Sequence, residues 1–211
     1  DAGVHVARAE AAGVRLLINT HVEGLEWKGD RILALQARAP EGPLRLEADA
    51  FVLAANTVES TRLLLRSQLG GPALGRYLMG MAGQISWALA PRPVWPFRSP
   101  QVVSGITQFR EGDFRRRQAA FLTSIGNDGW PQGAPPDLAQ VLIEEGLMGT
   151  ELRKALLDHV SRQVLLVSNC EELPFVENRI VLAAALDARG LPRPQIHYRI
   201  GRYTQAAIEQ C

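Results

Sequence analysis

The residues most suggestive of chemistry lie at 54–57, the small-residue sequence Ala-Ala-Asn-Thr, directly after an apolar run. The run predicts a buried strand over residues 51–55, and the leucine-rich stretch after the turn predicts a helix over about residues 58–67. In α/β folds ligands collect where strands end and helices begin, and small residues let a ligand approach the backbone closely. The turn is therefore a candidate ligand site. In the alternative interpretation, the two alanines only let the helix pack against the sheet.

Other reactive residue types are isolated along the chain. His21 lies near the end of a predicted strand, and no metal-ligand spacing links it to another histidine. Glu171 and Glu172 are adjacent, and adjacent residues of a strand point to opposite faces, which predicts surface charges instead of an acid–base pair. Neither a G-x-G-x-x-G dinucleotide fingerprint nor a G-x-S-x-G nucleophile elbow occurs. We expect no catalytic residue and no metal site in this chain.

The tryptophans and cysteines give weaker indications. Trp87, Trp95 and Trp130 could line a pocket, although large aromatic residues more often fill a core or an interface. Cys170 and Cys211 lie far apart in the sequence and lack metal-ligand spacing, so we expect two free thiols. None of these residues favours a particular reaction by itself.

Hydrophobic periodicity and turn signals predict the elements that must position these residues. The expected helices cover residues 4–12, 58–67, 137–145 and 150–159. The expected strands cover residues 14–19, 21–27, 31–38, 44–48, 51–55, 84–90, 101–109, 163–169 and 178–183, with one more after the Pro-x-Pro sequence at 192–194. Gly70-Gly71-Pro72 predicts a boundary between domains 1–71 and 72–211. We expect an α/β (α+β) fold, in which a lobe with an antiparallel insertion precedes a sheet-and-helix lobe.

The bulk properties exclude several function classes. The 211 residues are 46% hydrophobic and carry a net charge of +1, so no basic footprint points to nucleic acid. No apolar run approaches the ~20 residues that span a bilayer. No secretory signal is visible, and the compartment stays open.

Several segments resemble the glucose-methanol-choline (GMC) oxidoreductases, a family of FAD enzymes. Residues 51–67, FVLAANTVESTRLLLRS, followed by GRYLM at 75–79, resemble the family segment AAG-x-ETPRLLL…GRNLMD. Residues 177–198, ENRIVLAAALDARGLPRPQIHY, resemble the family pattern E-N-R-V-x-L…D-x-x-G-x-P-x-P-x-I-x-Y. The opening helix and strand resemble the segment whose valine contacts the adenine of FAD, and Val22 stands at that place.

The resemblance implies a fold, a cofactor and a reaction. It implies a partial FAD-binding domain at 1–71, a partial substrate-binding domain at 72–211, and FAD contacts by Val22, Ala54, Ala55 and Asn56. The most similar subfamily is that of bacterial gluconate, fructose and glucose dehydrogenase large subunits. Such enzymes oxidise a CH–OH group of an alcohol or sugar by hydride transfer to flavin and pass electrons to an electron-transfer partner.

Departures from the family pattern leave alternatives open. The family's Asn-Leu-x-Asp-His is Tyr-Leu-Met-Gly-Met at residues 77–81, and Asn56 stands where the family often has glycine. The family's catalytic histidine and its partner would follow Cys211, so we expect the chain alone to be inactive. We also expect it to self-associate, because the strand at 51–55 would expose an edge and apolar faces. A degenerate, non-catalytic binding module is the competing interpretation, and an unrelated α+β domain is a third.

Overall fold

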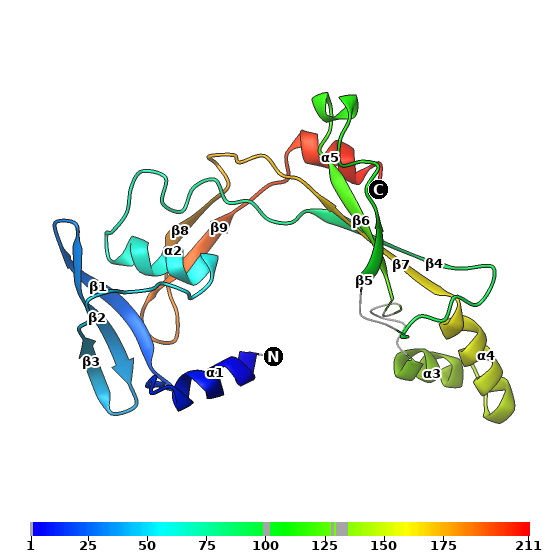
Figure 1. Cartoon of the computed structure of the whole chain (residues 1–211), viewed down its shortest axis with the longest axis horizontal. Coiled ribbons are helices and arrows are strands. Elements are labelled where there is room, and N and C mark those ends of the chain that lie inside the picture. The colour runs from blue at the N-terminus through cyan, green and yellow to red at the C-terminus, as the bar shows by residue number, and fades with distance from the viewer. Residues whose placement is uncertain (1, 99–101, 128, 130–134) are drawn as a thin grey trace. The chain divides into compact units, whose positions relative to one another are not determined.

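The chain folds into two compact units, each assembled from two separate segments. The computed structural model describes residues 2–98, 102–127, 129 and 135–211. Asp1–Leu78 and Phe175–Tyr198 make the first unit, and Met79–Pro174 and Arg199–Cys211 make the second (Figure 1). The expected boundary after residue 71 concerns a different division, that between a cofactor-binding and a substrate-binding domain. It stays a prediction.

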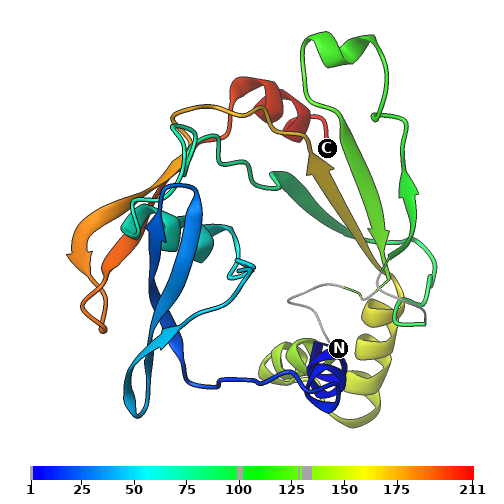
Figure 2. The ribbon, with the colours of Figure 1, turned by 60° about the vertical axis from the view of Figure 1, so that its left-hand side comes forward.

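The first unit combines two helices, a three-stranded antiparallel sheet and a hairpin. Its elements are α1 (Ala2–Ala11), β1 (His21–Lys28), β2 (Arg31–Ala39), β3 (Gly42–Leu46), α2 (Thr57–Arg66), β8 (Arg179–Leu186) and β9 (Pro192–His197). The sheet has the order β1-β2-β3, and β8 pairs with β9. Helix α2 packs against β1 and against the β8–β9 hairpin (Figure 2).

Local sequence signals account for these elements. The predicted turn between β1 and β2 contains Gly29, whose φ of 64° suits glycine in a two-residue hairpin loop. Ala37 of β2 is buried on the same side as Leu25 of β1, which pairs with Leu35, whereas the buried Ala34 points to the opposite face. Gly13 follows α1 with a φ of 91°, as expected for the residue after a helix C-terminus.

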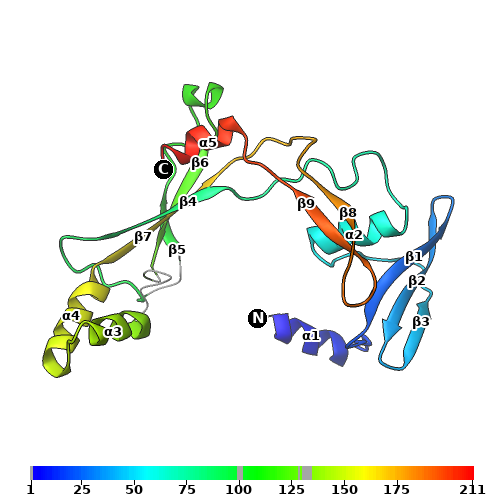
Figure 3. The same cartoon turned by 180° about the vertical axis from the view of Figure 1, so that it is seen from behind.

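The second unit contains a four-stranded antiparallel sheet and its connecting helices. Its elements are β4 (Gly83–Leu89), β5 (Val102–Ile106), the short 3₁₀ helix η1 (Asp113–Arg116), β6 (Phe121–Gly126), α3 (Pro135–Glu144), α4 (Gly149–Ser161), β7 (Gln163–Cys170) and α5 (Arg202–Ile208). The strand order is β4-β7-β6-β5. Helices α3 and α4 pack together, and α5 lies beside β7 (Figure 3).

A small aromatic core lies between α5 and the sheet of the second unit. The rings of Phe109 and Phe121 stack with centroids 4.6 Å apart, and Phe114 meets Phe109 edge-on at 6.1 Å. Ala119, Phe121, Cys170 and Ala207 are buried together in this cluster. The core therefore holds α5 to the ends of β6 and β7.

Two expected strands do not form in the structure. Residues 14–19 and 51–55 are irregular, and the three sheets of the described residues include neither segment. Val52 is 92% exposed, so the expected buried strand is wrong for this chain. An apolar strand needs neighbours to pair with and to cover its faces, and no described strand pairs with either segment.

The other expected helices and strands are confirmed within a few residues at their ends. Three short elements were not predicted, namely β6, η1 and α5. Trp130, a candidate pocket residue from the sequence, lies outside the described residues. No helix in the described part of the chain is long and apolar enough to cross a bilayer.

Candidate functional site

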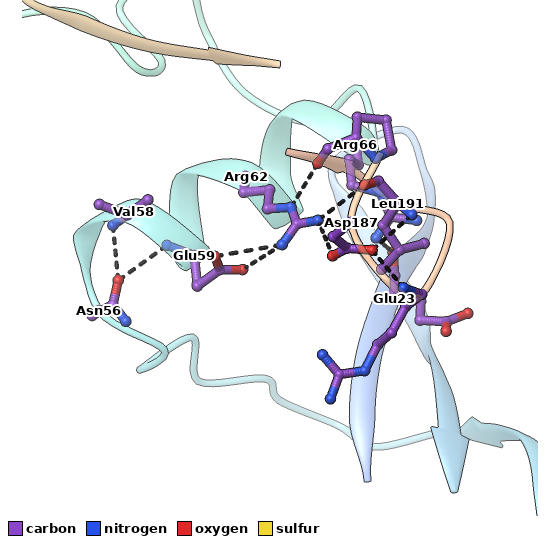
Figure 4. Close-up of polar contacts among 10 residues, drawn as sticks. Glu23, Asn56, Val58, Glu59, Arg62, Arg66, Asp187 and Leu191 are labelled. Carbon is purple, nitrogen blue, oxygen red and sulfur yellow. Dashed lines mark hydrogen bonds and ion pairs between the residues drawn. The ribbon is translucent and has the colours of Figure 1, made fainter. Parts of the chain in front are cut away.

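The turn before α2 has a geometry that only a few residue types adopt. Asn56 is the N-cap of α2 with φ 75° and ψ 168°, a backbone conformation that glycine adopts most readily. Its side-chain Oδ1 accepts hydrogen bonds from the backbone N–H groups of Val58 at 2.9 Å and Glu59 at 3.0 Å (Figure 4). These bonds satisfy two of the free donors at the helix start. The side chain of Asn56 therefore stabilises the turn.

A cavity of about 400 Å³ opens beside this turn in the first unit. It is lined by residues of β1, the turn, α2 and the β8–β9 loop, namely Thr20, His21, Val22, Ala55, Glu59, Arg62, Leu63, Arg66 and Arg189. Val22 and Ala55, two of the four predicted contact residues, therefore face one space although they are far apart in the sequence. Ala54 and Asn56 are exposed beside it and are not among its lining residues.

A bulge in β1 shapes the wall of the cavity next to Val22. Val22 pairs with Ala37 and Gly24 with Gln36, so Glu23 is an extra residue in this strand. The Arg66 guanidinium donates a hydrogen bond to the carbonyl oxygen of Glu23. Bulges of this kind re-aim the backbone and are frequent next to sites. The hydrogen bond from Arg66 to Glu23 connects the bulge of β1 to the last turn of α2.

Arg62 lines the cavity from α2. Its Nη2 lies 2.6 Å from Oδ2 of Asp187, and its Nε donates to the carbonyl oxygen of Pro192 at 2.8 Å (Figure 4). Its Nη1 lies 3.3 Å from the carboxylate of Glu59. The side chain is buried, so each donor needs a partner, and the β8–β9 hairpin provides most of them.

Asp187 organises the loop that brings Arg189 to the cavity. Its Oδ1 accepts hydrogen bonds from the backbone N–H groups of Arg189 at 2.8 Å and Leu191 at 3.0 Å. The hydrogen bond from Arg62, assisted by these backbone donors, holds the pKa of Asp187 well below its ordinary range. Arg189 itself is exposed at the edge of the cavity.

The cavity is suited to binding more than to covalent chemistry. Three arginines line it against one carboxylate, that of Glu59, which favours a ligand with negative charge. Its single imidazole is that of His21, and its lining contains no cysteine or serine. Among the described residues, no group of three or more histidine, cysteine or acidic side chains could hold a metal ion.

Comparison with known proteins relates the whole chain to a family. No family model matches the sequence. The chain is 32% identical to the fructose dehydrogenase large subunit of Gluconobacter japonicus, over 99% of the chain and 40% of that protein. It is also 34% identical, over 53% of the chain and 18% of the other protein, to an uncharacterised GMC-type oxidoreductase of Mycobacterium tuberculosis. The chain belongs to the GMC oxidoreductase family.

A solved structure extends the likeness of this GMC chain to its fold. Pyridoxine 4-oxidase from Mesorbium loti matches with a TM-score of 0.52 and 17% sequence identity, over 90% of this chain and 37% of that one. At this identity the match concerns the fold alone. The GMC chain spans 40% of the length of the fructose dehydrogenase subunit that it matches.

The sequence did not reveal the charged residues of the site. Arg62 and Arg66 are four residues apart, so they lie on one face of α2, but nothing local shows that this face is buried. Nothing in the local sequence distinguishes Asp187 from an ordinary turn residue, because its partner Arg62 lies 125 residues away. The Asp-x-x-Gly turn before Pro192 is the one signal that could have indicated a fixed loop.

Among the described residues of the second unit, the tryptophans and glutamates considered from the sequence do not form a site. Trp87 and Trp95 are exposed. Glu171 forms an ion pair with Arg115 at 3.1 Å, and Glu172 accepts a hydrogen bond from the backbone N–H of Gly80 at 2.6 Å. Both glutamates follow β7 and do not lie on it, so the strand geometry assumed for them is wrong. They remain surface charges, each with a local partner.

Proposed function

We propose that this chain is the part of an FAD-dependent GMC dehydrogenase that helps to bind the cofactor. The observation that carries the proposal is that Val22 and Ala55, two predicted FAD contacts from separate segments, line one cavity. The parent protein would oxidise a CH–OH group of an alcohol or sugar. When bound, FAD supplies the acceptor for the hydride that leaves the substrate carbon.

The residues present fit one end of such a cofactor. The side chains at positions 54 and 55 are methyl groups, which leave room for a flat ring beside the backbone. Val22 is half-buried and offers an apolar surface at the bulge of β1. Arg66 and Arg189 supply positive charge at the cavity for an anionic ligand. In this proposal Val22, Ala54, Ala55 and Asn56 border the bound cofactor.

We further propose that this chain binds and orients without moving the substrate proton. The cavity offers His21 as its single imidazole, and its lining contains no second histidine. The expected result is that the purified 211-residue chain reduces no electron-accepting dye with sugars or alcohols. Dye reduction that depends on such a substrate would overturn this part of the proposal.

An electron-transfer subunit is the proposed partner of the parent protein. The relative from Gluconobacter japonicus is by its name a large subunit, so that protein assembles with another subunit. We extend this association to the parent of the present chain. A pull-down of the complete parent protein with a cytochrome subunit would test it, and a parent that purifies alone and stays active with a soluble acceptor would contradict it.

A non-catalytic binding module is the second candidate function. It is favoured by residues 77–81, where the family's Asn, Asp and His are replaced. Tyr77, Gly80 and Met81 stand at those positions, so the amide, carboxylate and imidazole of the family pattern are missing there, and the Met81 side chain is 78% exposed. Such a module would retain no flavin, which distinguishes it from the first candidate.

Flavin retention tests the first proposal directly. The chain is incubated with FAD, desalted and examined by visible absorption near ~450 nm, the usual region of flavin absorption. Ala55→Leu fills the cavity and is expected to weaken FAD binding at least about tenfold, because the added side chain occupies the place of the ring. Ala11→Leu makes the same change at an exposed position of α1 and should leave binding unchanged.

The outcomes separate the candidates. Binding that Ala55→Leu weakens and Ala11→Leu preserves supports the cofactor site. Equal binding by all three proteins contradicts the role of this cavity, and a colourless wild-type chain favours the non-catalytic module.

A further inference from the structure

The two cysteines of the chain lie next to each other in the second unit. The Sγ atoms of Cys170 and Cys211 are 3.8 Å apart, although 41 positions separate the residues in the sequence. Cys170 is the last residue of β7, and Cys211 follows α5. Both are free thiols in this structure. Their proximity is a property of the fold, because spacing along the chain does not produce it.

Helix α5 is held in place from several sides, so the approach of the two sulfur atoms is well defined. Thr204 Oγ1 donates a hydrogen bond to the carbonyl oxygen of Glu171 at 2.9 Å. The Tyr203 hydroxyl donates to the carbonyl oxygen of Arg115 at 2.9 Å, and the carbonyl oxygen of Tyr203 accepts from the N–H of Ala119 at 3.0 Å. These bonds fix α5 next to the end of β7.

The two thiols differ in accessibility. Cys170 is 6% exposed and packs in the aromatic core with Phe121 and Ala207. Burial, together with the neighbouring Cys211 thiol, raises the pKa of Cys170 to about 12. Cys211 is half-buried, and its thiol donates to the carbonyl oxygen of Ala207 at 3.2 Å. Cys211 is therefore the thiol that a reagent from solution meets first.

We propose that Cys170 and Cys211 are a modification site, a dithiol that closes to a disulfide by exchange with small disulfides of the oxidised-glutathione class. The Cys211 thiolate attacks one sulfur of glutathione disulfide, forming a mixed disulfide and releasing one glutathione thiolate. Cys170 loses its proton to solvent and attacks Sγ of Cys211, which releases the second glutathione. Two protein thiols are oxidised to one disulfide, and one glutathione disulfide is reduced to two thiols.

The geometry permits closure with little rearrangement. A disulfide has an S–S distance of ~2.05 Å, so the sulfur atoms must approach by about 2 Å, which a rotation of the Cys211 side chain can provide. The bond would fasten α5 to the end of β7 and close a loop over residues 171–210, which contains the β8–β9 hairpin of the first unit and α5. A disulfide that closes a long loop reduces the conformational freedom of the unfolded chain and thereby stabilises the folded state.

Mass spectrometry of the whole chain tests the proposal. The reduced chain is incubated with oxidised glutathione under native conditions, alkylated and weighed intact. We expect the wild type to lose two hydrogens, to take up no alkylating reagent and to carry no glutathione, with peptide mapping linking residues 170 and 211. Cys170→Ala should instead keep glutathione on Cys211, and Cys211→Ala should leave the buried Cys170 unmodified.

Thermal unfolding provides a second measurement that needs no variant. We expect the melting temperature of the oxidised wild type to exceed that of the reduced wild type by about 5 °C. Dithiothreitol should remove this difference. A wild type that accumulates the mixed disulfide at Cys211, or that forms disulfide-linked dimers, would overturn the proposal. Equal melting temperatures for a verified internal disulfide would overturn its stabilising role.

Discussion

The guanidinium of Arg62 and the carboxylate of Asp187 form an ion pair with an Nη2–Oδ2 distance of 2.6 Å, across 125 residues of sequence (Figure 4). The pair joins α2 to the loop between β8 and β9. The same guanidinium donates to the backbone carbonyls of Leu191 and Pro192. A helix from the first segment of the unit and a hairpin from its second segment are thereby connected through one side chain.

Replacing this guanidinium should weaken the first unit even when the charge is kept. Arg62→Lys retains the charge but loses the planar fork that reaches two carbonyl oxygens and two carboxylates at once. We expect the free energy of unfolding to fall by about 1.5–3 kcal/mol, the range for hydrogen bonds to charged groups. Hydrogen exchange of the β8 and α2 amides measures the loss within this unit.

The exposed arginine of η1 provides a matched control. Arg116 is paired with Asp113 at 3.9 Å, and its side chain is 85% exposed. Arg116→Lys should leave stability unchanged, because such a pair in water contributes little. Equal effects of the two Arg→Lys changes would mean that the contacts of Arg62 are not what connects α2 to the hairpin.

Acid should weaken the ion pair between Arg62 and Asp187. The pKa of Asp187 in the folded chain lies below its ordinary value of 3.8, chiefly because Arg62 donates to it. The folded state therefore binds the proton less readily than the unfolded state, so the contribution of Asp187 is fully present above about pH 4 and is lost as pH falls below that value.

The measurement is hydrogen exchange or urea unfolding of the first unit at steps from about pH 5 downwards. Asp187→Asn cannot titrate, so the variant should start less stable and lose less on acidification than the wild type. The two curves should converge at low pH. Parallel curves across this interval would show that Asp187 does not carry the expected pH dependence.

The structure shows which parts of this fold a sequence can reveal. β1, β2 and α2 were predicted because their alternation, helical periodicity and the turn at Gly29 are local signals. The strand expected at residues 51–55 was wrong, because an apolar run becomes a strand only when neighbours pair with it, and no described strand does. Helix α5, with seven residues, is too short to give a clear periodic pattern.

Only part of the candidate site could be proposed from the sequence, and the basis was a family resemblance instead of a local structural signal. Val22 and Ala55 were proposed from the resemblance to a family, and neither residue type by itself indicates a ligand. Arg62 and Asp187 depend on a contact between distant segments, as do Cys170 and Cys211, and no spacing rule connects residues that only the fold brings together. Chemistry that depends on such contacts is visible in the structure alone.

The cap of α2 should distinguish a structural from a cofactor role for Asn56. Asn56→Ala removes the hydrogen bonds to Val58 and Glu59 and places alanine at φ 75°, so stability should fall by about 1–2 kcal/mol. Asn56→Gly also loses the cap but accepts this φ without strain, so its cost should be only a few tenths of a kcal/mol.

Thermal unfolding of the two variants measures this difference, and FAD retention is measured in parallel. A site in which the backbone of the turn borders the cofactor predicts that Asn56→Gly retains FAD as well as the wild type does. Loss of FAD by a stable Asn56→Gly protein would instead assign the contact to the asparagine side chain.

The uncovered apolar segment beside this turn should make the chain self-associate. Val52 is 92% exposed and Leu53 is 41% exposed, and both belong to a run that no described strand pairs with. Apolar surface and free backbone groups together favour pairing with another chain. Val52→Lys places a charge on this segment and should reduce association. Ile143→Lys, at a residue of α3 that is 51% exposed, makes a comparable change in the second unit and should have a smaller effect.

Sedimentation velocity over a range of concentrations measures the association of the three proteins. The wild type and Ile143→Lys should shift to larger species as concentration rises, whereas Val52→Lys should stay closer to a monomer. A wild-type chain that remains monomeric at the highest concentration would contradict the expectation. Association that Ile143→Lys suppresses and Val52→Lys does not would assign it to α3 instead, because then the exposed helix and not the unpaired segment would carry the contact.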